Sequence, residues 1–203
     1  MVSTKFLGVI ISDDLKWKEH TNVVSNRVSK SIGVLNKVRY ILPVGVLSTL
    51  YCTLIISYYQ YCNIIWASDY LSNLQNYVCC KNELFVWLAK LSGVTTPPYL
   101  SKRNRQLNIF DINKFQIVSF MCKFNSNLLP GNFNMFFQTN EQIHHHDTRC
   151  KRNIHFISHN TTMRSFNIRV QGPLLWNSLD PLIKQCYSLN SFKNTFKRHL
   201  LSL

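Results

Sequence analysis

The chain has 203 residues and a formal net charge of +14, with 23 lysines and arginines against 9 aspartates and glutamates. Its hydrophobic fraction of 46% is enough to build the core of one domain or of two small ones. The charge excess favours a polyanionic partner, with nucleic acid first and an anionic membrane surface second, and it says nothing about the fold.

The seven cysteines are an odd number, and no two of them are spaced as C-x-x-C. This pattern favours buried thiols in a reducing, intracellular compartment, and it does not decide between nucleus and cytoplasm. The N-terminus has no long apolar segment behind a basic start, which argues against a secretory signal.

Residues 5–20 predict a strand, a polar turn and the start of a helix. The apolar run at residues 6–11 is typical of a buried strand, and Gly8 within it indicates a bulge or a close approach of the backbone. Because no second strand is evident nearby, we expect this strand to pair with a sheet that lies mostly outside this chain. The polar residues that follow are typical of a turn and a helix N-cap: Ser12, Asp13 and Asp14.

Residues 15–40 predict an amphipathic helix, with Asp14 as its candidate cap. Basic side chains fall on the face opposite the apolar one. The apolar residues recur at steps of three and four: Val24, Val28, Ile32, Leu35 and Val38.

Residues 44–66 contain no charged residue and are long enough for a membrane span, which needs about 20 apolar residues. Their frequent Ser, Thr, Tyr and Asn side chains are costly in hydrocarbon, so we prefer a central core helix. A membrane-associated helical protein built on this segment remains an alternative.

Residues 69–91 predict a third helix, which Pro97 and Pro98 bring to an end. A further helix is expected at residues 111–129. The segment 132–169 is rich in Asn, His and Arg, has little periodicity, and is expected to be loop with short strands.

The last helical region is expected to open at Gly172-Pro173, with a second short helix at residues 191–201. The predicted fold is therefore mainly α: a helical bundle with a short N-terminal β-strand or hairpin and an irregular basic C-terminal region. The expected domains are residues 1–14, 15–96 and 97–203.

The adjacent Asp13 and Asp14 invite comparison with a polymerase, because two-metal phosphoryl transfer needs clustered carboxylates. No other acidic residue stands on a second predicted strand that would complete such a cluster. Turn formation explains the pair better, so we predict neither a catalytic residue nor a metal site there.

The segment 144–159 has enough nitrogen and sulfur ligands for zinc, but their spacing matches no standard zinc finger. We prefer a basic, solvated loop and keep a small zinc-dependent nucleic-acid-binding module as an alternative. The candidate ligands are His144, His146, Cys150, His155 and His159.

Nucleic-acid binding is the best supported chemistry, because cations that neutralise phosphates cluster near aromatic residues such as Trp17 that can stack on bases. No base-reading motif is present, so contact with the backbone is expected. The candidate residues form three groups: Lys16, Lys18, Arg27, Lys30 and Lys37; Lys102, Arg103 and Arg105; Arg149, Lys151 and Arg152.

A family resemblance rests on several segments in a fixed order. The N-terminal segment resembles the region after the catalytic hairpin in reverse transcriptases of non-LTR retrotransposons (LINE-type, jockey- and CR1-like), with the pattern F-L-G, two hydrophobic residues and an acidic one, then L-x-W-x-x-H. The matching residues are Lys5-Phe6-Leu7-Gly8-Val9-Ile10-Ile11, Leu15, Trp17 and His20, then Tyr61-Cys62-Asn63-Ile64-Ile65-Trp66, and finally Gly172-Pro173-Leu174-Leu175-Trp176-Asn177-Ser178-Leu179.

This resemblance implies the end of a polymerase palm, a helical thumb and a C-terminal tail, with Phe6, Leu7, Gly8 and Val9 in the place of the primer grip. The family's metal-binding aspartates, including its aromatic-x-Asp-Asp pair, lie upstream of the F-L-G strand, whereas Asp13-Asp14 follows it. The implied protein is a fragment of an RNA-directed DNA polymerase that is inactive alone and needs no cofactor, although the intact enzyme uses Mg²⁺. Its implied partners are the backbone of an RNA–DNA template–primer and the palm and fingers of the full-length enzyme.

Overall fold

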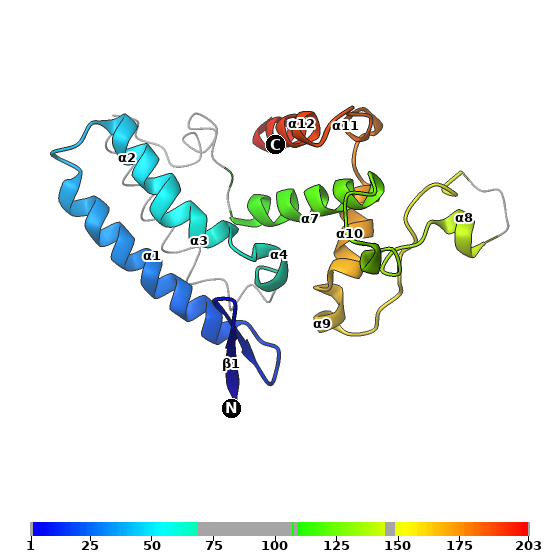
Figure 1. Ribbon diagram of the computed structural model, residues 1–203, viewed down its shortest axis with the longest axis horizontal. Helices are drawn as coiled ribbons and strands as arrows, with labels where there is room; N and C mark the ends of the chain where they lie inside the picture. Colours follow the sequence, from blue (N-terminus) through cyan, green and yellow to red (C-terminus); the bar gives the residue numbers. More distant parts are fainter. Residues whose placement is uncertain (1, 69–106, 108, 145–148, 203) are drawn as a thin grey trace. The chain divides into compact units, whose positions relative to one another are not determined.

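The computed structural model describes residues 2–68, 107, 109–144 and 149–202 (Figure 1). The fold is mainly helical with an N-terminal two-stranded hairpin, which confirms the predicted fold class. The chain forms two compact units, Met1–Ile112 (unit 1) and Asn113–Leu203 (unit 2). The domain boundary predicted between residues 96 and 97, like the helix predicted at 69–91, lies outside the described residues.

Unit 1 begins with an antiparallel hairpin of strands β1 (Ser3–Phe6) and β2 (Val9–Ser12). Leu7 and Gly8 form its turn with φ angles of +46° and +83°, and two successive left-handed residues suit the twist of a tight hairpin. The prediction of one strand without a partner is therefore wrong. The turn divides the apolar run, and the partner strand lies upstream. Its mostly polar residues gave no strand pattern in the sequence.

Helix α1 (Lys18–Val38) presents the predicted apolar face to the core. Its start differs from the prediction, because Trp17 occupies the N-cap and no side chain caps the helix there. Asp14 instead accepts hydrogen bonds from the Ser12 hydroxyl at 2.6 Å and the Lys16 N–H at 3.0 Å, and so closes the turn before the helix.

The segment predicted as one core helix is divided in the structure. A π-helical turn interrupts it, and Cys62 adopts a left-handed conformation with φ of +50° that breaks it. The carbonyls freed at the break are used, since Asn63 Nδ2 donates to Tyr59 O and Trp66 Nε1 donates to Tyr61 O, both at 2.8 Å. The pieces are α2 (Val44–Tyr51), η1 (Cys52–Ile56), α3 (Ser57–Gln60) and α4 (Asn63–Trp66).

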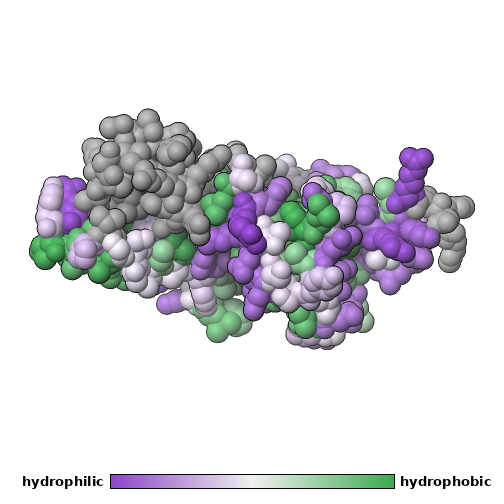
Figure 2. Space-filling view, turned by 90° about the horizontal axis from the view of Figure 1, so that it is seen from above, coloured by the Kyte–Doolittle hydropathy of each residue, from purple (hydrophilic) through white to green (hydrophobic). Residues whose placement is uncertain are grey.

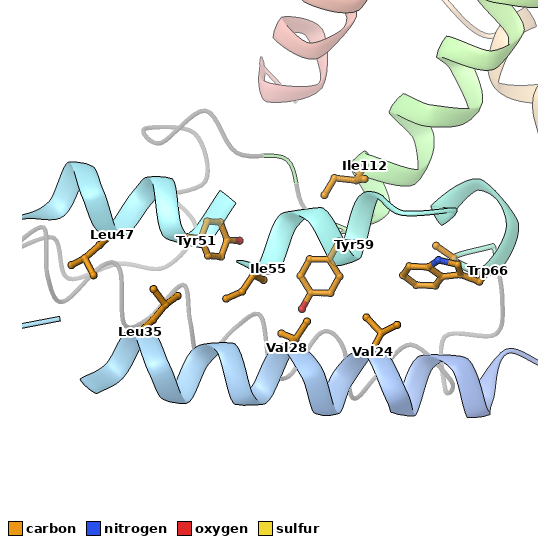
Figure 3. Packing of buried hydrophobic residues seen from close by; sticks show 10 residues of the cluster. Val24, Val28, Leu35, Leu47, Tyr51, Ile55, Tyr59, Trp66 and Ile112 are labelled. Carbon is orange, nitrogen blue, oxygen red and sulfur yellow. The ribbon is translucent and has the colours of Figure 1, made fainter. Parts of the chain in front are cut away.

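Within the described part of the chain, no helix has the length and apolar character needed to cross a bilayer. In unit 1 the helical run of residues 44–60 instead packs along α1. Figure 3 shows the facing side chains of the two helical segments, which together form a continuous core. Residues of that core include Val24, Val28, Leu35, Leu47, Tyr51, Ile55, Tyr59 and Trp66.

Tyr51 is fully buried in this core, and its hydroxyl has no hydrogen-bond partner among the described residues. Burial, as the main cause, raises the pKa of this phenol. A buried hydroxyl without a partner has lost its hydration without compensation, which destabilises the folded state.

We therefore expect Tyr51→Phe to raise the free energy of unfolding by about 1 kcal/mol, because it removes the hydroxyl and keeps the ring. Urea denaturation followed by circular dichroism measures this change. The control is Tyr187→Phe, since Tyr187 is fully exposed and its hydroxyl is hydrated. A lower unfolding midpoint for Tyr51→Phe than for the wild type would contradict the assignment.

Unit 2 begins within α7 (Ile109–Asn125) and continues through short helices. In place of the short strands expected at 132–169, its described residues contain one isolated bridge, between Thr139 and Ile154. The helices that follow α7 are η2 (Gly131–Phe133, a 3-10 turn), α8 (Asn140–Ile143), α9 (Thr162–Ser165), α10 (Ile168–Asn177), α11 (Pro181–Lys184) and α12 (Leu189–Ser202).

Two of these helices begin earlier than predicted. Helix α10 starts at Ile168, so Gly172-Pro173 lies inside it instead of opening it. Helix α12 starts at Leu189, and the Ser188 hydroxyl accepts from the Ser191 N–H at 3.1 Å. Ser188 therefore caps the helix, and Ser191, where the predicted helix began, lies inside its first turn.

The side chain of Asn177, at the end of α10, binds both backbone groups of one residue. Its Oδ1 accepts from the Ile154 N–H at 3.2 Å, and its Nδ2 donates to the Ile154 carbonyl at 2.8 Å. Ile154 is buried and pairs with Thr139 on its other side. The amide thus takes the place of a neighbouring strand and connects the 139–154 loop to α10.

Replacing Asn177 by Ala is expected to destabilise unit 2 by about 2 kcal/mol, because it removes two hydrogen bonds and leaves backbone groups of a buried residue unpaired. Amide hydrogen exchange at Ile154 reports this directly and should become much faster. The control Asn190→Ala changes an exposed asparagine of α12 and should leave that amide protected. Unchanged protection at Ile154 in Asn177→Ala would refute this role.

Candidate nucleic-acid interface

Three cations form an exposed basic face on α1: Arg27, Lys30 and Lys37. Lys30 and Lys37 are seven residues apart, so they point in nearly the same direction and lie about 10 Å apart along the axis. Arg27 lies at the border of this face, with its guanidinium carbon 6.0 Å from the centre of the Tyr58 ring. The contact orients Arg27 without removing it from solvent.

The charges along the segment that carries the basic face have one sign. Residues 20–68 include four lysines and arginines and no acidic residue, and the nearest acidic residues in the sequence are Glu19 and Asp69. An ion pair lies at the start of this region, where Lys16 Nζ is 3.5 Å from Asp14 Oδ2. Lys16 is therefore partly neutralised, whereas Lys18 is exposed at the start of α1.

The predicted primer-grip residues lie at the hairpin and differ in exposure. Phe6 and Leu7 are exposed and apolar at the end of the hairpin, and Gly8 is exposed beside them. Val9 is buried, so its side chain packs in the protein and is not accessible to a ligand. The hairpin thus offers Phe6 and Leu7 to a partner.

Two side chains that the site prediction did not include hold this hairpin. The His20 ring accepts a hydrogen bond at Nδ1 from the Ile10 N–H at 3.4 Å, and it packs edge-on against Trp66 with 5.6 Å between ring centres. Tyr61 donates its hydroxyl to the Leu7 carbonyl, and a Cβ on Gly8 would lie 3.7 Å from its ring. The W-x-x-H spacing was the available signal for His20.

Trp17 does not serve as an exposed stacking platform, because it is half-buried against the core of unit 1. Its place at the N-cap of α1 explains this orientation. Lys16 and Lys18 therefore flank a packing residue, and the expected combination of cations with an accessible ring does not occur at this point.

The other predicted cations form two groups, one in unit 2 and one outside the described residues. Arg149 and Arg152 are exposed and Lys151 is half-buried in a turn of unit 2. This turn packs on α8, where the Glu141 N–H donates to the Lys151 carbonyl at 3.0 Å. The other predicted group, Lys102, Arg103 and Arg105, lies outside the described residues.

The described residues include no group of three or more His, Cys, Asp or Glu side chains that could hold a metal. His144 and His155 have ring centres 5.8 Å apart, and His155 Nδ1 lies 3.2 Å from Asn140 Oδ1. His146, another of the five candidate zinc ligands, lies outside this part of the chain.

The carboxylates of Asp13 and Asp14 are used within their turn. Asp13 Oδ1 accepts from the Asp14 N–H at 2.9 Å, and hydrogen bonds from Ser12 and then Lys16 lower the pKa of Asp14. These residues do not fit the Mg²⁺ of the intact polymerase family, since no third carboxylate among the described residues joins them.

No disulfide links the cysteines of the described segments. Cys122 is buried, as predicted, and burial raises the pKa of its thiol. Cys52 and Cys150 are exposed, which corrects the expectation that the thiols are buried. Cys79 and Cys80 are outside the described ranges.

Comparisons of this chain with known protein families, with curated proteins and with solved structures found no match.

The burial of His20 behind the hairpin makes unit 1 sensitive to pH. Burial, and then the positive charge of Arg27, lower the pKa of His20 below its usual value of 6.5. The unfolded chain therefore binds the proton more tightly, so stability is complete above pH 6.5 and falls as the pH drops from 6.5 toward the lowered pKa.

We expect this fall to reach up to about 1.4 kcal/mol per pH unit in the wild type and to be reduced in His20→Gln, which cannot titrate. Urea unfolding of both proteins between pH 7.5 and 5 gives the difference in slope. Since the other histidines and the carboxylates are common to both proteins, their contributions cancel. Equal pH slopes would exclude this role of His20.

Proposed function

We propose that this chain is the end-of-palm, thumb and C-terminal region of a non-LTR retrotransposon reverse transcriptase and binds the phosphate backbone of a template–primer duplex. The observation that carries the proposal is the basic face of α1, which is exposed and has no acidic residue near it in the sequence. The resemblance of the segments around Phe6, Trp17 and Tyr61 to that family supports the assignment.

The spacing of the cations suits a backbone. Lys30 and Lys37 are about 10 Å apart along the helix, and a DNA strand carries one phosphate per 3.4 Å of helix axis, so the pair spans about three phosphates. Binding of this kind releases counterions and carries no sequence information. The expected ligand is therefore any duplex, whatever its sequence.

The proposal assigns no phosphoryl-transfer step to this chain. Asp13 and Asp14 are committed to their turn by hydrogen bonds from the backbone and from Ser12. The described part of the chain holds no other cluster of carboxylates that would bind two metal ions. In this proposal the chain binds nucleic acid, and the palm of the intact enzyme catalyses phosphoryl transfer.

The test is the salt dependence of binding, measured by fluorescence anisotropy with an RNA–DNA duplex and the whole chain. If about four cations contact phosphates, log K falls with log salt with a slope of roughly −3 to −4. The double variant Lys30→Gln/Lys37→Gln removes two contacts, so its slope should be smaller in magnitude by about 1.8.

A matched variant separates a local interface from the general effect of net charge. Lys114→Gln/Lys197→Gln removes two exposed lysines from helices of unit 2 and changes the net charge equally. It should keep the wild-type slope. An equal loss in both variants would show that no particular face binds, and a lack of binding at low salt would refute the proposal.

A further inference from the structure

The loop between α1 and α2, residues 39–43, exposes two large apolar side chains. Tyr40 is 80% exposed and Ile41 is 79% exposed. Hydrophobic and hydrophilic surface adjoin at the left end of Figure 2, which is the end where Figure 1 places this loop. Exposure of two adjacent apolar residues at a tip calls for an explanation, since a solvated turn favours polar residues.

The loop is held in place by the residues around the tip. The N–H groups of Ile41 and Leu42 both donate to the Val38 carbonyl, at 3.0 and 3.1 Å. Val38 and Leu42 are half-buried against the core, and Pro43 precedes α2 in an extended conformation. With both ends fixed, Tyr40 and Ile41 are held outward.

Cations lie directly beside this tip. The Arg39 guanidinium donates to the Tyr40 hydroxyl, and its carbon lies 4.4 Å from the centre of the Tyr40 ring. Lys37, the last residue of the basic face of α1, precedes it by two positions. The tip thus continues the positive surface of the helix and adds an aromatic ring and an aliphatic side chain to it.

We propose that Tyr40 and Ile41 contact an unpaired base at the junction of duplex and single strand, while the basic face of α1 holds the phosphates of the duplex. This inference rests on the proposed function and names the form of nucleic acid that the site prefers. In a blunt duplex every base is stacked on its neighbours, so the ring has no partner. An unpaired base offers a free face, and stacking on an aromatic side chain tolerates any sequence.

A lipid surface fits the same tip less well. Anchoring needs a large buried apolar area, and even one myristoyl chain gives only marginal binding. Two side chains bury less apolar area than that acyl chain, so the tip contributes too little to anchor the protein in a bilayer.

The test compares Tyr40→Ala with the wild type on two RNA–DNA substrates, a blunt duplex and the same duplex with a four-nucleotide overhang. Loss of one stacked base should weaken binding of the overhang substrate about fivefold or more, because stacking on an aromatic residue contributes at least about 1 kcal/mol. Binding of the blunt duplex and the salt slope should stay unchanged, since no charge is removed. Tyr40→Phe, which keeps the ring, should retain the preference.

The control is Tyr187→Ala, which removes a fully exposed tyrosine from unit 2 and should change the binding of neither substrate. If Tyr40→Ala binds the overhang substrate as tightly as the wild type does, this inference is overturned. A salt-dependent interface on α1 would remain intact. Complete absence of binding at low salt would instead refute the proposed function. A third result would assign the tip to lipid. In that case the wild type binds vesicles of phosphatidylserine and phosphatidylcholine, Tyr40→Ala does not, and both bind nucleic acid equally.

Discussion

A two-stranded hairpin is at best marginally stable in water, and this constraint governs the N-terminal half of the described structure. Strand β1 is exposed along its whole length, so it contributes little burial. The hairpin therefore depends on what lies behind it. His20 binds the backbone of β2, and Tyr61 binds the turn from the other helical segment. The orientation of Phe6 and Leu7 is thus set by residues far from them in the chain.

Several residues that carry the family resemblance have structural roles in this fold. Gly8 provides a left-handed turn residue, Trp66 donates to the carbonyl of Tyr61 at the helix break, and Asn177 satisfies both backbone groups of Ile154. Gly172 lies so close to Met121 that a Cβ there would come within 2.6 Å of the sulfur. Such positions accept few residue types for reasons of packing and hydrogen bonding. Their presence therefore specifies the fold more directly than the chemistry.

The sequence was sufficient to predict the mainly helical class and the buried face of α1, because a 3.6-residue period survives without tertiary context. It was insufficient for β1, whose residues Ser3 to Lys5 are polar on both faces and show no alternation. The break at Cys62 was not predicted either, since neither Gly nor Pro marks it. The carbonyls that it frees accept hydrogen bonds from the side chains of Asn63 and Trp66, which no sequence pattern indicates. For the candidate site, the spacing of the cations placed them on one face of α1. The burial of Val9 and the partial burial of Trp17 could not be predicted, because they depend on tertiary packing.

The placement of charge along residues 13–39 favours one end of α1 for binding a polyanion. Asp13, Asp14 and Glu19 all lie at the hairpin end of α1, and Asp14 partly neutralises Lys16. From His20 to the loop before α2, every charged residue is positive. Since exposed charges interact over about 8–10 Å at physiological salt, the acids reduce attraction near the hairpin and leave the far half of α1 unopposed. The proposed phosphate contacts are therefore expected toward Lys30, Lys37 and Arg39, and the exposed ring of Tyr40 lies at that same end of α1.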